Sequence, residues 1–211
     1  MIQDEDAQRI LMTNVLELYH IKNLIGIDIN EIRLMHQPQQ YFIDDNGIFP
    51  NSILPILYYP NALQLPPLFS ARQVKSLFEK NEWTNNWRNG IYTYHHYHSI
   101  THEAMAVIRG KTNLQLGADD GIKLTIKKGD VLVVPAGVAH KNLGNEKDVI
   151  VIGGYPGGKD YDMNYGKPEE RPAADNNIKK LPVPSTDPLL GKANGVPKIW
   201  KSGRQKAGKK K

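Results

Sequence analysis

The sequence predicts a mainly β protein, preceded by a helix and an extended arm. From residue 90 onward the apolar runs are short, and Gly, Pro, Asn or Asp separates them, as in "GIKLTIKKGD" and "VLVVPAG". Some runs alternate apolar and polar residues, as at Ile122, Leu124 and Ile126, which is the two-residue period of a strand. The glycine-rich "IGGYPGGKD" matches no phosphate loop and is interpreted as a turn after the last strand. Such closely spaced strands favour a sandwich or barrel over a parallel α/β sheet.

The composition is that of one globular domain. The chain has 211 residues, of which 40% are hydrophobic and 23% charged. It contains no cysteine, which excludes disulfides, thiolate metal ligands and a cysteine nucleophile, so any metal would be bound by nitrogen and oxygen. No apolar run approaches the ~20 residues that span a bilayer. The acidic start "MIQDEDAQRI" lacks the basic end of a secretory signal, and we expect a cytoplasmic protein.

Residues 1–36 are expected to form a helical extension, and residues 37–200 the main domain. Residues 37–69 contain six prolines, which argue against a long helix and predict an arm in which "YFID" and "ILPILYY" are edge strands. Residues 70–81 predict a short helix that begins at a serine. Over 7–25, apolar residues recur at the spacing of an amphipathic helix, at Ile10, Leu11, Val15, Leu18, Ile21, Leu24 and Ile25.

The positive charge of the chain belongs to its C-terminal end. From Gly191 onward there are eight Lys and Arg residues and no acidic residue. Because the whole chain carries +5, the part before Gly191 carries −3. We expect residues 201–211 to form a basic disordered tail. The rest of the chain has no DNA-reading helix pattern or base-stacking motif, so we do not expect nucleic-acid binding.

Histidine is concentrated in one short stretch. Of the seven histidines, four lie within eight consecutive positions, and His140 follows further on. Side chains alternate between the two faces of a strand. A strand over 91–98 would therefore place His96 and His98 on one face, together with Tyr94. Two imidazoles spaced in this way can bind a single metal ion.

Two further groups can complete such a metal site. After a four-residue turn, Glu103 opens the next strand, and an antiparallel pairing would bring its carboxylate beside the imidazoles. His140 follows a Pro-Ala-Gly turn at the start of another strand. In a closed barrel, three imidazoles and one carboxylate would then converge. A turn one residue different would put His102 in the place of Glu103, whereas His95 would face the opposite way.

The spacing of these residues resembles the two motifs of the cupin superfamily. Motif one, residues 90–110, has the pattern Gly, five residues, His, one, His, four, Glu, six, Gly. Motif two, residues 129–144, has Gly, five residues, Pro, one, Gly, two, His. The family pattern then expects Asn at position 144, where this chain has Gly144, a packing position. Stretches between about residues 41 and 200, such as "DDNGIFPNSILPILYY" and "WRNGIYTYHHYHSITHE", resemble the YjlB-like branch of bacterial cupins.

The resemblance implies a double-stranded β-helix, which is a jelly-roll barrel, with a metal bound inside it. The ligands would be His96, His98, Glu103 and His140. Three neutral imidazoles and a carboxylate suit a divalent transition metal, whether Fe, Mn, Ni, Co, Cu or Zn. This set leaves one or two coordination positions open, as catalytic sites do.

The function that we expect is a metal-dependent enzyme acting on a small molecule, with dioxygenase, isomerase or lyase chemistry all compatible. Glu103 is a candidate base, and Tyr94 could offer its hydroxyl to a substrate. The alternative is a non-catalytic small-molecule-binding or sensor protein. We also expect a homodimer, because the arm at 41–60 could cover the sheet edge of a second copy.

Overall fold

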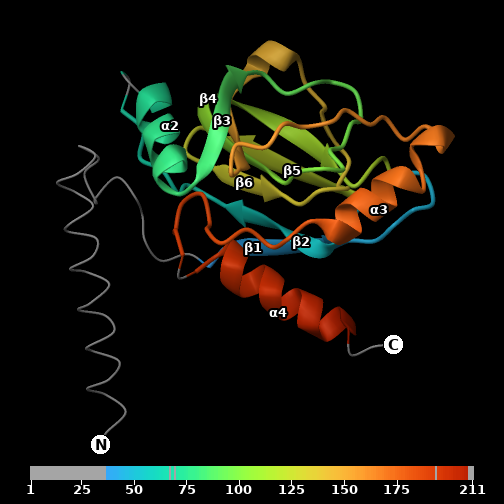
Figure 1. Cartoon of the computed structure of the whole chain (residues 1–211). Helices are drawn as coiled ribbons and strands as arrows, with labels where there is room; N and C mark the ends of the chain where they lie inside the picture. The colour runs from blue at the N-terminus through green and yellow to red at the C-terminus, as the bar shows by residue number, and fades with distance from the viewer. Residues whose placement is uncertain (1–36, 67, 69, 193, 209–211) are drawn as a thin grey trace, which may run out of the picture.

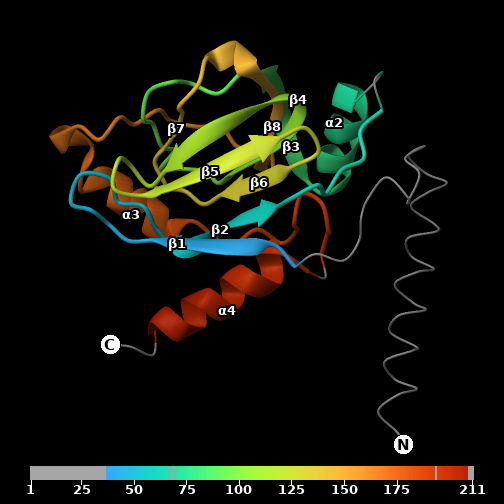
Figure 2. The ribbon, with the colours of Figure 1, turned by 180° about the vertical axis from the view of Figure 1, so that it is seen from behind.

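The computed structural model describes residues 37–66, 68, 70–192 and 194–208, so the expected helix over 7–25 lies outside the described residues. These residues form an antiparallel sheet of eight strands in the order β1-β2-β6-β4-β8-β3, while β5 and β7 both pair with β4 (Figures 1 and 2). The mainly β prediction is confirmed. No helix in the described part of the chain is long and apolar enough to cross a membrane.

The arm and the helix over 70–81 form where the sequence predicts them, but the "ILPILYY" strand lies between two other strands, so its prediction as an edge strand is wrong. The strands are β1 (Gln39–Ile43), β2 (Ser52–Tyr59), β3 (Trp83–Asn89), β4 (Glu103–Leu116), β5 (Ile122–Lys127), β6 (Val131–Val134), β7 (His140–Asn142) and β8 (Val149–Pro156). The helices are α2 (Ser70–Lys80), α3 (Ala173–Lys180) and α4 (Val196–Gly208), with 3-10 turns at η2 (Glu146–Asp148) and η3 (Pro168–Glu170).

The strand predicted over 91–98 does not form. His96 makes one isolated bridge to His140, and Tyr97 makes another to Asn164. The pairing partner therefore changes after a single residue, which prevents a continuous ladder. The bridge still fixes the backbone of His96 against the start of β7, through N–H···O bonds of 3.2 and 2.9 Å between the two histidines.

Strand β4 connects the two parts of the sheet. Its first half pairs with β6 and β8, and its second half pairs with β5 and β7. The strand turns at Gly110, which has a φ of +80°, and a Cβ there would lie 1.9 Å from the backbone oxygen of Asp148. Only glycine fits this close approach without strain, which explains the last glycine of motif one.

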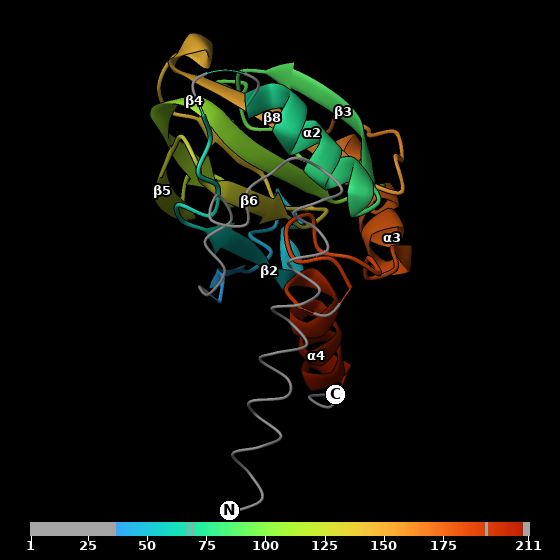
Figure 3. The same cartoon turned by 90° about the vertical axis from the view of Figure 1, so that its left-hand side faces the viewer.

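The side chains of β4 divide between two hydrophobic clusters. Ala104 and Ala106 face an outer cluster, which α2 covers on the β3 and β8 side (Figure 3). Met105 and Val107 face an inner cluster together with Leu114 and other residues of the sheet. Glu103 continues the phase of Met105, so the alternation of β4 directs its carboxylate to the inner side.

The C-terminal end contains a helix that the sequence analysis did not predict. The sequence predicts a disordered tail from residue 201, whereas α4 continues to Gly208 and lies along β2 (Figure 1). Trp200 is fully buried in the outer cluster, and its Nε1 donates to the backbone oxygen of Pro55 at 2.9 Å. This contact across 145 residues anchors the helix, whereas the charge pattern of the tail indicates only solvation.

Candidate metal centre

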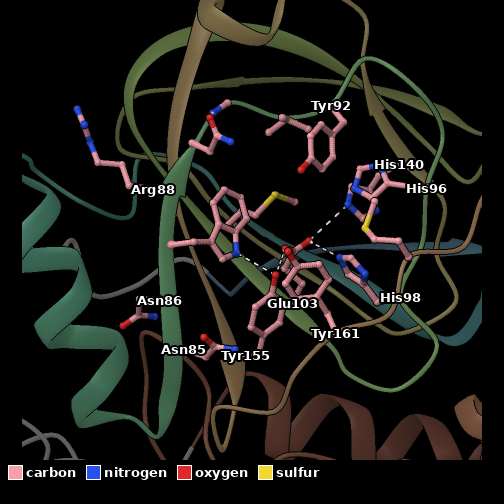
Figure 4. A pocket seen from close by; sticks show the side chains of 16 residues that line it. Asn85, Asn86, Arg88, Tyr92, His96, His98, Glu103, His140, Tyr155 and Tyr161 are labelled. Atoms are coloured by element: carbon pink, nitrogen blue, oxygen red, sulfur yellow. Dashed lines mark hydrogen bonds and ion pairs between the residues drawn. The ribbon is translucent and has the colours of Figure 1, made fainter.

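Three histidine side chains meet at the inner side of the sheet. His96, His98 and His140 are all buried, and one ring nitrogen from each lies within 4.8 Å of the other two (Figure 4). The structure therefore brings together the three imidazoles that the sequence singles out. His140 opens β7, as predicted, and holds His96 through the bridge described above.

Each of the three rings is oriented by a backbone carbonyl. A carbonyl oxygen can only accept, so the ring nitrogen facing it carries the proton and the other nitrogen presents a lone pair. This is the arrangement that metal-binding histidines use. The Nδ1–O distances are 3.2 Å for His96 and Tyr94, 2.5 Å for His98 and Asp162, and 3.1 Å for His140 and Val138.

The carboxylate of Glu103 lies against this imidazole cluster. Its Oε2 is 3.4 Å from Nε2 of His140 and 3.7 Å from Nε2 of His98. Glu103 is 3% exposed, and Oε2 has no hydrogen-bond partner among the residues that the structure describes. A buried, unpartnered carboxylate oxygen beside unprotonated imidazole nitrogens fits a divalent cation, which these N and O donors would satisfy.

The pKa values at the cluster follow from burial and from the carboxylate. Burial, followed by the neighbouring His140, lowers the pKa of His96 to about 3, so this ring is neutral at neutral pH. Burial alone would raise the pKa of Glu103, but the neighbouring imidazoles of His140 and His98 hold it well below its usual range. Burial would likewise lower the pKa of His98, but the Glu103 carboxylate raises it above its usual value. When its imidazoles are unprotonated, the site therefore carries one negative charge, which a cation can neutralise.

Glu103 is also bonded on its far side. Tyr155 Oη donates to Oε1 of Glu103 at 3.3 Å, and Nε1 of Trp87 donates to Tyr155 Oη at 2.9 Å. Burial, followed by the charge of Glu103, raises the pKa of Tyr155 far above its usual value. The tyrosine is thus a hydrogen-bond donor at every physiological pH.

A cavity of about 310 Å³ opens beside the cluster. Its wall includes aromatic side chains from three parts of the chain, namely Trp87, Tyr92, Tyr155 and Tyr161. Arg88 also lines the cavity, but its side chain points away from the imidazoles (Figure 4). The space is large enough for a small organic molecule next to a bound ion.

The other candidate residues lie outside the cluster. The ring of Tyr94 packs edge-on against that of His96, with ring centroids 5.7 Å apart. Tyr94 is 42% exposed and does not line the cavity, whereas Tyr92 does. His102 lies in the outer layer, where its ring is 4.7 Å from that of Trp200 and its Nδ1 accepts from the N–H of Ala136. It cannot take the place of Glu103, because its ring lies against Trp200 of the outer cluster, on the other side of the sheet from the imidazoles.

Tyr155 and Trp87 are parts of the site that the sequence motifs do not indicate. The interpretation of "IGGYPGGKD" as a turn is wrong for its first half, because Gly153, Gly154 and Tyr155 lie within β8. Two adjacent glycines in a strand often mark a close approach of another group, and that signal was available. Here Trp87 of β3 pairs in register with Gly153.

Comparison with known proteins supports the two motifs. A family model described as Cupin matches residues 83–156. The uncharacterized protein YjlB of Bacillus subtilis (strain 168) is 39% identical over 165 residues, which cover 78% of this chain and 97% of the relative.

Two solved structures are more distantly similar. Acireductone dioxygenase from Bacillus anthracis, with a cadmium ion in its active centre, is 15% identical over 47% of this chain and 77% of that chain, with a TM-score of 0.35. A variant of Bacillus subtilis oxalate decarboxylase is 20% identical over 53% of this chain and 27% of that chain, with a TM-score of 0.31. These scores are low, so neither reaction is transferred to this chain.

Proposed function

The chain belongs to the YjlB-like branch of the cupin superfamily, and we propose that it is a metal-dependent enzyme acting on a small molecule. The proposed ligands are His96, His98, Glu103 and His140. A divalent Fe, Mn, Ni, Co, Cu or Zn ion suits this set of three imidazoles and one carboxylate.

One observation carries the proposal. The three imidazoles converge within 4.8 Å of one another, next to a carboxylate oxygen that has no other partner in the described structure. A purely structural site closes all its coordination positions with protein ligands, whereas this one borders a cavity of about 310 Å³. The cavity leaves room for a substrate beside the ion, which favours catalysis over a structural role.

The chain's own residues have definable parts in such a reaction. The bound ion would supply Lewis-acid or redox chemistry. The backbone carbonyls of Tyr94, Asp162 and Val138 keep the imidazoles in one tautomer and orientation. The aromatic wall limits access of water to the substrate, and a Glu103 carboxylate released from the ion could accept a proton from a bound molecule. The geometry gives the catalytic role considered for Tyr94 less support, since this side chain stands outside the cavity.

The reaction type is proposed at the level of dioxygenase, isomerase or lyase chemistry. A non-catalytic small-molecule-binding or sensor protein is the second candidate, since the same cavity could hold a ligand without turnover. Product formed from a small molecule by the metal-loaded protein supports the enzyme. Binding of that molecule without product supports the binding or sensor protein.

Two further proposals concern the setting of the protein. We propose a homodimer, because the outer edge of β1 is unpaired in the described sheet and Phe42 and Ile53 beside it are 65% and 66% exposed. Light scattering of the purified full chain tests it, and a monomer contradicts it. We also propose a cytoplasmic location, which the absence of cysteine from the sequence suits.

Elemental analysis of protein purified without an affinity metal tests the metal site. We expect about one transition-metal ion per chain, and a melting temperature that falls when a chelator removes the ion. His96→Ala should lose both the bound ion and the effect of the chelator on the melting temperature. His95→Ala is the matched control, because His95 is the adjacent residue, but its Nε2 bonds Asp119 at 2.9 Å. A folded wild-type protein that takes up no transition metal contradicts the proposal.

A further inference from the structure

The hydroxyl group of Tyr155 is held between two side chains of the cavity. It accepts from Nε1 of Trp87 at 2.9 Å and donates to Oε1 of Glu103 at 3.3 Å (Figure 4). An indole N–H can only donate, and an ionised carboxylate can only accept. The direction of both bonds is therefore fixed, and the tyrosine proton points at Glu103.

These bonds make the two oxygens of Glu103 unequal. Oε1 is bonded to Tyr155, whereas Oε2 has no hydrogen-bond partner within the described residues. Oε2 is also the oxygen that faces Nε2 of His140 and of His98, at 3.4 and 3.7 Å. A carboxylate bonded at one oxygen offers the other to an ion among the imidazoles.

We propose that Tyr155, oriented by Trp87, is a positioning residue that makes Glu103 bind the metal ion through Oε2 alone. This inference rests on the proposed function, because it requires an ion at the imidazole cluster. Removing an outer hydrogen bond to a metal ligand weakens metal binding by about 10–100-fold.

The fold reserves space for this arrangement. Trp87 and Gly153 are paired residues of β3 and β8, and a Cβ on Gly153 would lie 2.0 to 2.3 Å from atoms of the indole ring. Glycine at this position therefore lets the indole lie close against β8. On the other side, the ring of Tyr161 stacks on that of Tyr155, with centroids 5.2 Å apart and an angle of 26° between the rings. The Tyr155 side chain is thus fixed by packing as well as by hydrogen bonds.

Co²⁺ binding by Tyr155→Phe tests the inference, because this variant removes the hydroxyl and keeps the ring. The dissociation constant is measured by competition with a chromophoric chelator, and the visible spectrum of bound Co²⁺ reports its ligand geometry. We expect a dissociation constant about 10–100-fold above that of the wild type and a changed spectrum. Tyr58→Phe is the matched control, because Tyr58 is also buried and donates to a carboxylate, that of Asp130, at 2.7 Å, but does not line the cavity.

The outcomes separate this inference from the proposed function. A folded Tyr155→Phe with the wild-type dissociation constant and spectrum overturns the positioning role and leaves the metal site intact. A wild-type protein that binds no Co²⁺ overturns the proposed function, and the inference with it. If Tyr155→Phe does not fold, Trp87→Phe decides, since it keeps the hydroxyl but removes the group that orients it. Weaker Co²⁺ binding by Trp87→Phe supports the inference, and unchanged binding overturns it.

Discussion

Nδ1 of His98 lies 2.5 Å from the backbone oxygen of Asp162, a residue 64 positions later in the chain. The side chain of Asp162 reaches the same loop, where it accepts from the N–H groups of Ser99 and Ile100 at 2.6 and 3.2 Å and from Ser99 Oγ at 2.5 Å. Asp162, which follows β8, therefore orients a histidine of the candidate metal centre and also holds the turn after that histidine.

Asp162→Asn should loosen this turn, because an amide replaces a charged acceptor with one oxygen and one donor. We expect a loss of about 1.5–3 kcal/mol in the free energy of unfolding, which is the range for hydrogen bonds to a charged group. Urea denaturation at neutral pH measures this loss. Asp160→Asn is the control, because Asp160 is exposed and its contact to Asn85 is long, at 3.4 Å. Equal stability of the two variants would show that Asp162 does not hold the turn.

The contribution of Asp162 should depend on pH in a defined direction. Burial alone would raise its pKa, but hydrogen bonds from Ser99, Asn164 and Ile100 hold the pKa below its usual value. A lowered folded-state pKa stabilises the protein above the unfolded value of about 3.9, and this stabilisation is lost as the pH falls through the folded pKa. The stability difference between wild type and Asp162→Asn should therefore be constant near neutrality and shrink below about pH 4. A difference that grows in acid contradicts this assignment.

Co²⁺ binding should weaken as the pH falls through neutrality. The pKa of His98 is raised despite its burial, because the Glu103 carboxylate stabilises the protonated ring, so protons already compete with the ion above the usual histidine pKa of about 6.5. In the metal-free protein, the ion pair between protonated His98 and Glu103 stabilises the fold below about pH 6.5. This stabilisation is lost as the pH rises through the folded-state pKa of His98. His96 does not add to the competition until about pH 3. Dissociation constants measured between about pH 8 and pH 5 test this, and a constant value contradicts it.

Gly153→Ala should displace Trp87. The new methyl group would overlap the indole ring, and overpacking of this kind typically costs about 1–3 kcal/mol. Thermal unfolding measures the loss of stability, and tryptophan fluorescence reports the displaced ring. Gly157→Asn is the control, because Gly157 has open space around its Cβ position and asparagine tolerates its φ of +65°. Wild-type stability and fluorescence in Gly153→Ala would show that the contact is not tight.

Trp200→Ala should show that α4 belongs to the folded domain. The side chain is fully buried, and truncation of a buried Trp typically costs about 3–5 kcal/mol. Lys198→Ala, on the exposed side of the same helix, should change the free energy of unfolding by less than about 0.5 kcal/mol. If Trp200→Ala and Lys198→Ala both have the same free energy of unfolding as the wild type, α4 does not contribute to stability.

The sequence predicts much of the candidate metal centre because two of its spatial relationships are local. A two-residue spacing brings the side chains of His96 and His98 to one side. Glu103 and Met105 are also two residues apart, so the Glu103 carboxylate shares the inward direction of Met105. The expected 91–98 strand is wrong, yet the imidazoles still converge, because the single bridge between His96 and His140 performs the same task. This bridge is a pairing with a segment far away in the chain, and a local sequence pattern contains no information about such a pairing.

The missed features depend on contacts between residues far apart in the chain. Trp200 docks on Pro55, and Trp87 reaches Tyr155 across two strands. A lysine-rich end indicates exposure to solvent unless the buried partner of Trp200 is known. A pair of glycines such as Gly153 and Gly154 indicates a turn unless the neighbouring strand is known. These features follow from the packing of the sheet and not from the period of the sequence.

X-ray absorption of the Co²⁺-loaded full chain tests the central claim most directly, together with anomalous diffraction from its crystals. The account predicts a single ion bound by three imidazole nitrogens and one oxygen at about 2.0–2.2 Å, located between His96, His98 and His140 with Oε2 of Glu103 beside it. An ion bound elsewhere, or one with fewer than three imidazole ligands, would contradict it.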